Sequence, residues 1–193
     1  MADLATPDAT TANDRRGLTL LPAALIGAAV AVLLGVYGRN HDAAGQALFT
    51  FGFSGTINMK AWLATIVFAL AITQLLLALW MYGKLGRASA PPWVAPTHRL
   101  VGTLAFLVSL PVAYHCLWSL GFKTPSNGTR VFWHSLFGCA FYGAFTVKVL
   151  AVRSRRMPNW TLPVVGGLVF ALLVGLWFTS SLWFFDHSGF PSF

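Results

Sequence analysis

The sequence predicts an all-α integral membrane protein with five transmembrane helices. Hydrophobic residues make up 56% of the chain and charged residues only 9%, whereas a soluble domain carries roughly 25% charged residues. Five apolar runs stand out, each of about 20 residues or more, which is enough for a helix to cross a hydrocarbon core of about 30 Å. Backbone groups in lipid must be paired within their own segment, so runs of this length are helices and not barrel strands.

The five helices are predicted to form a single transmembrane domain over residues 18–186. The first run is long for the apolar region of a signal peptide, and no small-x-small cleavage motif follows it, so we expect it to remain as a helix. Residues 1–17 are polar and small and are predicted to be a disordered cytoplasmic tail, while residues 187–193 form an external tail. The predicted helices cover approximately residues 18–37, 61–82, 100–122, 131–152 and 162–185.

Positive charges predict the orientation of the bundle. The formal net charge is +8, but the basic residues flank the apolar runs, where they face lipid headgroups and not nucleic acid. With a cytoplasmic N-terminus, nine Lys and Arg residues lie on the cytoplasmic flanks and four on the outer flanks. The positive-inside rule therefore predicts a multi-pass protein of the cell membrane with its C-terminus outside. The four outer residues are Arg39, Lys60, Lys123 and Arg130.

Several function classes lack support in the sequence. It contains no phosphate-binding glycine loop, no paired carboxylates and no nucleophile triad, so hydrolysis and phosphoryl transfer of the soluble type are not indicated. Inverted repeats and broken mid-membrane helices, which are typical of small transporters, are not evident either. The preference for Arg over Lys and the richness in Ala, Gly and Leu are typical of a bacterial membrane protein from a high-GC genome.

Two histidines on neighbouring predicted helices are the main candidates for a functional site. His115 lies about 10 Å below the outer end of its helix and His134 about 5 Å below the same surface. The short connection between them makes the two helices antiparallel neighbours. Either each imidazole is an ordinary core residue, or the two ligate one metal between the helices. Haem iron accepts neutral imidazole, and bundle cores house cofactors, so a shared haem is the favoured interpretation.

The surroundings of the two histidines agree with this interpretation. Gly138 lies one turn below His134 on the same face, and its missing side chain leaves room for a porphyrin edge. Pro111 precedes His115 by four residues and removes a backbone N–H, which can bend the helix and turn His115 inward. Small residues and prolines are also ordinary in membrane helices, so the packing explanation stays open.

His98 is a weaker candidate for a second haem. It lies 17 residues before His115, about 25 Å away along the helix axis, and no histidine faces it from the inner ends of the other helices. We expect it to anchor the start of its helix beside Arg99. His41 and His187 fall in the outer loop and the C-terminal tail, where solvated histidines are common.

Other polar or reactive residues lie near the same outer surface. Cys116 and Cys139 lack metal-ligand spacing, and buried free cysteines pack as small hydrophobes. The outer end of the last helix is unusually polar and is a candidate to face a pocket, a quinone headgroup or haem propionates, through Thr179, Ser180, Ser181 and Asp186.

The FWHSLFG opening of the fourth predicted helix, together with His98 and His115 on the third, resembles the small transmembrane b-type cytochromes, including the ascorbate- and ferric-reductase-like group. In that group a His-Ser-x-x-Gly opening, matched here by His134, Ser135 and Gly138, carries an axial haem ligand. The resemblance covers roughly residues 60–185. It implies a helical bundle with buried haem. The group has four helix histidines in two pairs, whereas one pair is visible here.

Together these observations predict a membrane b-type cytochrome that passes single electrons. One haem b is held by His115 and His134 near the outer leaflet, with a quinone as a further candidate cofactor. The expected partners are the lipid bilayer and other subunits of a respiratory redox complex, with a quinol or redox protein as the electron donor or acceptor. The alternative is a cofactor-free accessory or assembly subunit of a larger membrane complex.

Overall fold

The computed structural model describes residues 9–86, 89–154 and 157–190, and its ordered elements are all helical over those ranges. Five helices are long and apolar enough to cross a membrane, as the sequence predicts. Two of them change from α to π geometry before they end. The elements are α1 (Ala9–Asn40), α2 (Thr56–Met81), α3 (Val94–Tyr114), η1 (His115–Leu120), η2 (Pro125–Asn127), α4 (Thr129–Arg153), α5 (Thr161–Trp177), η3 (Phe178–Leu182) and α6 (Trp183–Ser188).

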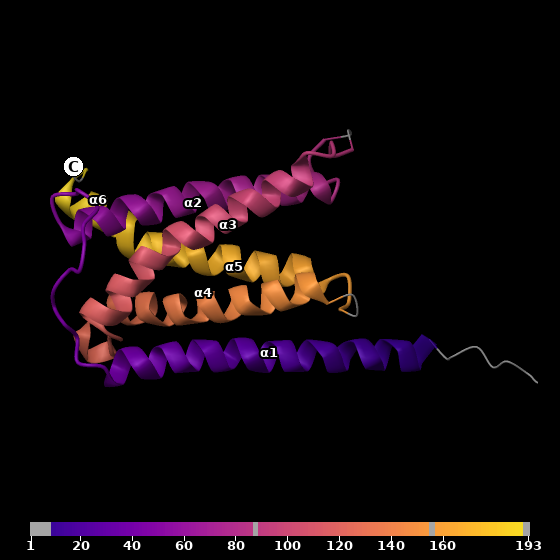
Figure 1. The fold of residues 1–193 in the computed structure, drawn as a ribbon, viewed down its shortest axis with the longest axis horizontal. Coiled ribbons are helices and arrows are strands. Elements are labelled where there is room, and N and C mark those ends of the chain that lie inside the picture. The colour runs from indigo at the N-terminus through magenta and orange to yellow at the C-terminus, as the bar shows by residue number, and fades with distance from the viewer. Residues whose placement is uncertain (1–8, 87–88, 155–156, 191–193) are drawn as a thin grey trace, which may run out of the picture.

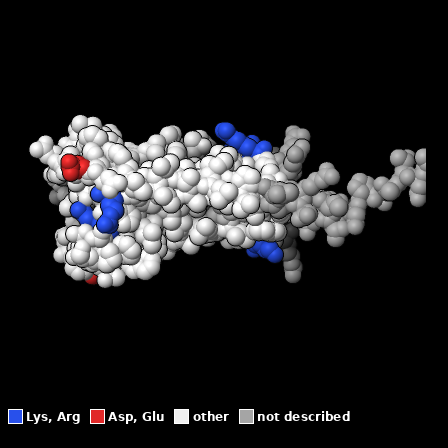
Figure 2. All heavy atoms as spheres, turned by 90° about the horizontal axis from the view of Figure 1, so that it is seen from below, with Lys and Arg blue, Asp and Glu red and all other residues white. Residues whose placement is uncertain are grey.

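The helices run along one long axis, with the start of α1 at one end of the bundle and α6 at the other (Figure 1). We call the end that holds residues 41–55, η2 and α6 the C-terminal end. The closest backbone packing joins α1 to α4, α2 to α3 and α4 to α5. A central apolar cluster of Val67, Ala71, Phe141 and Leu173 ties α2, α4 and α5 together. Figure 2 shows charged side chains at both ends and an uncharged belt between them on the face displayed, which is the pattern that a bilayer requires.

Most helix boundaries extend beyond the apolar runs. The α2 helix begins at Thr56 instead of residue 61, and α4 begins at Thr129 instead of residue 131. The α1 helix begins at Ala9, so residues 9–17, which we expected to be disordered, are helical; residues 1–8 lie outside the described part. A hydropathy run measures the membrane-embedded length, whereas a helix continues into polar residues because each added residue gains one backbone hydrogen bond.

Two glycines allow α1 to lie directly against α4. A Cβ placed on Gly27 would lie 2.6 Å from the carbonyl oxygen of Gly143, and a Cβ on Gly143 would lie 2.9 Å from the Cβ of Ala31. Both distances are shorter than van der Waals contact, so neither Gly27 nor Gly143 can be replaced by a residue with a side chain without moving the helices apart. Small residues at such crossings let membrane helices approach closely and gain dispersion energy.

The α3 and α4 helices are linked by the short segment 121–128, yet they are not among the pairs with close backbone packing in the described structure. Large side chains bridge them instead. Phe106 stacks on Phe145 with ring centroids 4.5 Å apart, and Ser109 Oγ lies 3.0 Å from the hydroxyl of Tyr142. These bridging side chains hold the two backbones apart, and space remains between them toward the C-terminal end.

Both π-helical segments lie at this C-terminal end. The η1 segment continues α3 after Pro111, and η3 joins α5 to α6. Proline cannot donate the backbone hydrogen bond of an α-helix, which favours a local change of geometry. Single π turns are frequent at functional sites because the wider turn redirects side chains. The two segments here turn side chains toward the space between α3, α4 and α5.

The crossing of α1 and α4 predicts that Gly143→Ala destabilises the protein. The added methyl group has no space beside the carbonyl of Gly27 and the side chain of Ala31, so we expect a loss of about 1–3 kcal/mol in unfolding free energy. Thermal unfolding in detergent measures the effect. Gly167→Ala is the matched control, because a Cβ at Gly167 meets no atom within 4 Å. Equal midpoints for the two variants would contradict the close crossing.

Candidate functional site

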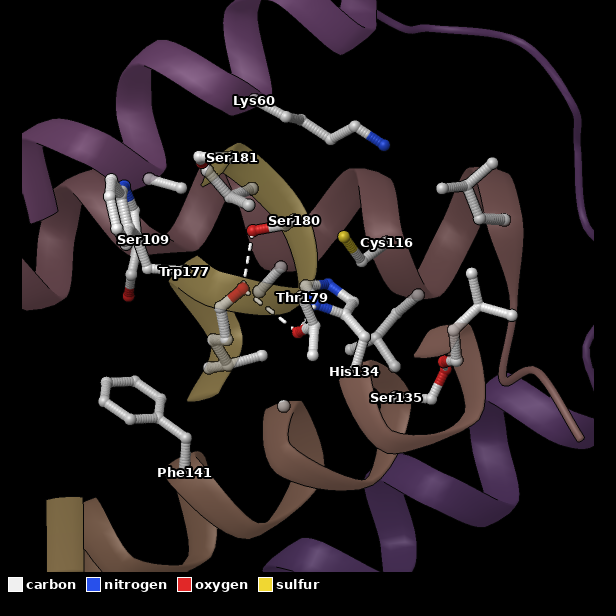
Figure 3. Close-up of a pocket in the computed structure, with 18 of the residues that line it drawn as sticks. Lys60, Ser109, Cys116, His134, Ser135, Phe141, Trp177, Thr179, Ser180 and Ser181 are labelled. Atoms are coloured by element: carbon white, nitrogen blue, oxygen red, sulfur yellow. Dashed lines mark hydrogen bonds between the residues drawn. The ribbon is translucent and has the colours of Figure 1, made fainter. Parts of the chain in front are cut away.

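A cavity of about 330 Å³ lies between α2, α3, α4 and α5 at the C-terminal end of the bundle (Figure 3). Its walls are mainly apolar and include Val67, Val112, Phe141 and Leu173. Cavities of about 300–1,000 Å³ with apolar walls and a few convergent polar groups are typical of cofactor and small-molecule sites. The polar groups here come from four helices and include Cys116, His134, Ser135, Ser180 and Ser181.

His134 is the imidazole of this cavity, and one hydrogen bond fixes its tautomer. The Nδ1 atom lies 3.0 Å from Oγ1 of Thr179 on η3. The Thr179 hydroxyl donates its own proton to the carbonyl of Gly175 at 2.7 Å, so it accepts from His134, and Nδ1 carries the hydrogen. The other ring nitrogen, Nε2, therefore carries the lone pair. Metal-ligating histidines use the same arrangement, with one N–H bonded to a second residue and the free nitrogen directed at the metal.

His115 has the same tautomer but a different environment. Its side chain is completely buried, and Nδ1 donates to the carbonyl of Pro111 at 2.9 Å. The Nε2 atom is buried and has no hydrogen-bond partner among the described residues. However, His115 is not part of the cavity wall. It packs edge-on against Phe49 of the α1–α2 loop (residues 41–55), with ring centroids 4.7 Å apart.

The α1–α2 loop covers the His115 side of η1. Backbone bonds join Ala44 N to the carbonyl of Trp118 and Gly45 N to the carbonyl of Ser119, and the Ser119 hydroxyl donates to the carbonyl of Gln46 at 2.7 Å. His41 packs against Trp118, with ring centroids 4.6 Å apart and the ring planes tilted by 37°. The structure therefore places His115 under this loop and His134 in the cavity. The two predicted ligands therefore lie in different environments, His115 against Pro111 and Phe49 and His134 against Thr179.

Several of the other residues singled out in the sequence line the cavity. Gly138 lines the cavity below His134, and a Cβ there would approach only Leu176, at 3.9 Å. Thr179, Ser180 and Ser181 also face the cavity, as one of the sequence-based alternatives proposed. Both Cys116 and Cys139 are free thiols on its wall.

His98 lies at the opposite end of the bundle from the cavity. It is partly buried near the start of α3, its carbonyl accepts a bond from Gln74 Nε2, and its Nδ1 has no partner among the described groups. His187 is exposed on α6 and pairs with Asp186 at 3.4 Å. Across the described ranges, no group of three or more His, Cys, Asp or Glu side chains is arranged to hold a metal ion.

Sequence reasoning missed three cations on the cavity wall. Arg130 lines the cavity, and its guanidinium lies 3.7 Å above the Trp183 ring and donates to the carbonyl of Thr179. A signal for it exists, because Arg130, His134 and Gly138 recur every four residues and therefore share one face of α4. Lys60 and Lys123 have no comparable signal, because their positions on the wall depend on how α2 and the 121–128 segment pack.

The fold and the cavity define a class: a five-helix multi-pass membrane protein with a ligand-sized cavity between four helices at one end. Residues 20–192 match the family described as "Family of unknown function (DUF6529)", which covers most of the chain, so the protein belongs to this family. No curated protein and no solved structure shows significant similarity to the chain.

The bond between His134 and Thr179 predicts that Thr179→Val destabilises the protein. The valine keeps the side-chain shape but leaves the Nδ1–H of His134 without its acceptor, which costs about 1–3 kcal/mol for a buried donor. Thermal unfolding measures the loss. Thr103→Val is the matched control, because the Thr103 hydroxyl is exposed and bonds only the Arg99 carbonyl of its own helix. Equal unfolding temperatures of the two variants would show that the bond does not stabilise the protein.

Proposed function

We propose that this protein is a membrane b-type cytochrome that binds one haem in the cavity between α2, α3, α4 and α5, where His134 would ligate the iron. The observation that carries the proposal is the tautomer of His134, a residue of the cavity wall, whose Nδ1 donates to Thr179 and whose Nε2 therefore carries the lone pair. A free imidazole nitrogen in an apolar cavity is the usual haem-iron ligand.

The rest of the cavity supports a flat, largely apolar cofactor. Small side chains, including Ala61, Ala64, Ala113 and Gly138, occur on three of the four helices around it. The aromatic rings of Phe141 and Trp177 line it as well. Bound haem supplies a one-electron couple. The protein contributes the ligating imidazole, its hydrogen bond to Thr179 and the low-polarity surroundings, and these are the factors that set a haem potential.

This proposal differs in one respect from the sequence-based prediction, in which His115 and His134 both ligate the haem. His115 lies under the α1–α2 loop and outside the cavity wall. We therefore propose only His134 as a ligand of the haem iron. Electron exchange with a quinol or a redox protein at the C-terminal end of the bundle remains part of the proposal, as does membership of a larger respiratory assembly.

A spectrum tests the proposal directly. We expect purified protein, reconstituted with haem, to show a Soret band that shifts on reduction with dithionite, and His134→Ala to lose at least tenfold in haem occupancy. Because His115 lies outside the cavity, His115→Ala keeps the band, and so does the exposed control His187→Ala. Gly138→Leu, which keeps the imidazole but fills the cavity, also lowers haem occupancy.

The possible results separate the candidate functions. Loss of the band in His115→Ala as well would favour the paired ligands predicted from the sequence. No band in the wild-type protein would refute the cytochrome and leave two candidates, a quinone site and a cofactor-free accessory subunit.

A quinone site is the second candidate, because Lys60 lines the same cavity as His134 and its ammonium group can donate to a quinone carbonyl. It predicts a colourless protein that retains extracted quinone, and His134→Ala or Gly138→Leu would release it.

The orientation is proposed from the excess of positive charge at the N-terminal end of the bundle. In a background with both native cysteines replaced by alanine, we expect Ser126→Cys in η2 to react with a membrane-impermeant maleimide on intact cells. Asn159→Cys, in the exposed connection between α4 and α5, reacts only after the cells are opened. The reverse labelling pattern would place the cavity at the cytoplasmic face.

A further inference from the structure

Three cations line the end of the cavity nearest the membrane surface. Lys60 comes from the first turns of α2, Lys123 from the segment after η1, and Arg130 from the first turn of α4. We call this set the basic rim. Figure 3 shows the Lys60 side chain extending over the cavity on the same side as Cys116 and His134. Cations at membrane ends ordinarily face lipid headgroups, whereas these three surround an internal space.

No acidic side chain among the described residues forms an ion pair with the basic rim. The chain has five acids, all aspartates, and in the described residues the ion pairs comprise only His187 with Asp186. Figure 2 shows basic and acidic side chains at this end of the molecule, but no acidic residue lines the cavity together with the three cations. Like charges on the wall of one mainly apolar cavity repel one another, and that repulsion is relieved when an anion enters.

Arg130 is the rim residue with a fixed position. Its guanidinium stacks 3.7 Å from the Trp183 ring centroid and donates one N–H to the backbone carbonyl of Thr179. The hydroxyl of the same Thr179 accepts from His134. One residue of η3 therefore orients both the cation and the imidazole. A guanidinium has five N–H donors, so four remain for an oxyanion, which Arg binds well in a bidentate manner.

We propose that the basic rim binds the oxyanion of the cavity's ligand, a carboxylate or phosphate carried on an apolar body. The apolar walls below the rim hold the body, and the rim holds the charged end at the C-terminal surface. The identity of the anion as the propionate carboxylates of haem rests on the proposed function. A lipid headgroup phosphate is the other source of the same chemistry.

The test compares haem with its dimethyl ester, which has the same porphyrin and iron but no carboxylate charge. The apoprotein in phosphatidylcholine nanodiscs is titrated with each and the Soret absorbance is followed. We expect haem to bind at least tenfold more tightly than the ester, since a charge-assisted hydrogen bond contributes about this factor or more. Arg130→Gln and Lys60→Gln weaken haem binding and leave ester binding unchanged, which brings the ratio of affinities toward one.

Two further variants separate charge from folding. Arg130→Lys retains the positive charge and is expected to keep part of the preference for haem over the ester. Arg39→Gln removes a cation at the same end of the bundle that does not line the cavity, and it leaves the preference intact. Equal affinities of the wild-type protein for haem and ester overturn the proposal for propionates.

The lipid arm covers the case in which neither porphyrin binds, a result that refutes the proposed function. Native mass spectrometry of protein purified from phosphatidylglycerol-containing membranes then measures retained anionic lipid. Retention by the wild-type protein and loss in Arg130→Gln and Lys60→Gln, but not in Arg39→Gln, support the rim with phosphate as its anion. Equal lipid retention in all four proteins overturns the proposal that the basic rim binds an anion.

Discussion

The bilayer leaves no backbone N–H or C=O unpaired, and the rest of this structure depends on that requirement. It makes the five apolar runs into helices, and it makes every interruption of a helix visible. Pro111 lacks the N–H of a regular turn, and α3 changes to π geometry at His115. The imidazole of His115 then donates to the carbonyl of Pro111. On η3, the hydroxyls of Thr179 and Ser180 donate to backbone carbonyls one turn earlier.

The cavity follows from how these helices pack. Glycines bring α1 against α4, while the stacked Phe106 and Phe145 keep α3 away from α4. Close contact on one side of α4 and aromatic spacing on the other leave a space that small side chains do not fill. The two π segments, η1 and η3, border it and provide much of its polarity.

Several polar features of the cavity meet at one residue. Thr179 accepts from His134 through its side chain and from Arg130 through its backbone, so the metal-ligating candidate and the fixed cation of the basic rim have a common support. An imidazole and a guanidinium on one cavity wall match the proposed ligand, which has a coordinating or hydrogen-bonding centre and an anionic end. Because both side chains bond to Thr179, a change at η3 is expected to move both of them together.

The sequence by itself determined the class of fold and the candidate imidazole, because hydropathy and residue type are properties of the chain. It placed His134 and Gly138 on one face of α4, since helical periodicity is local. It did not determine helix ends in polar residues, as at Ala9 and Thr56. Only the tertiary structure decided that His115 lies under the α1–α2 loop and outside the cavity wall, and that Lys60 and Lys123 line the cavity. Those positions depend on π turns, on proline and on the spacing of neighbouring helices, which are set by packing between segments far apart in the chain.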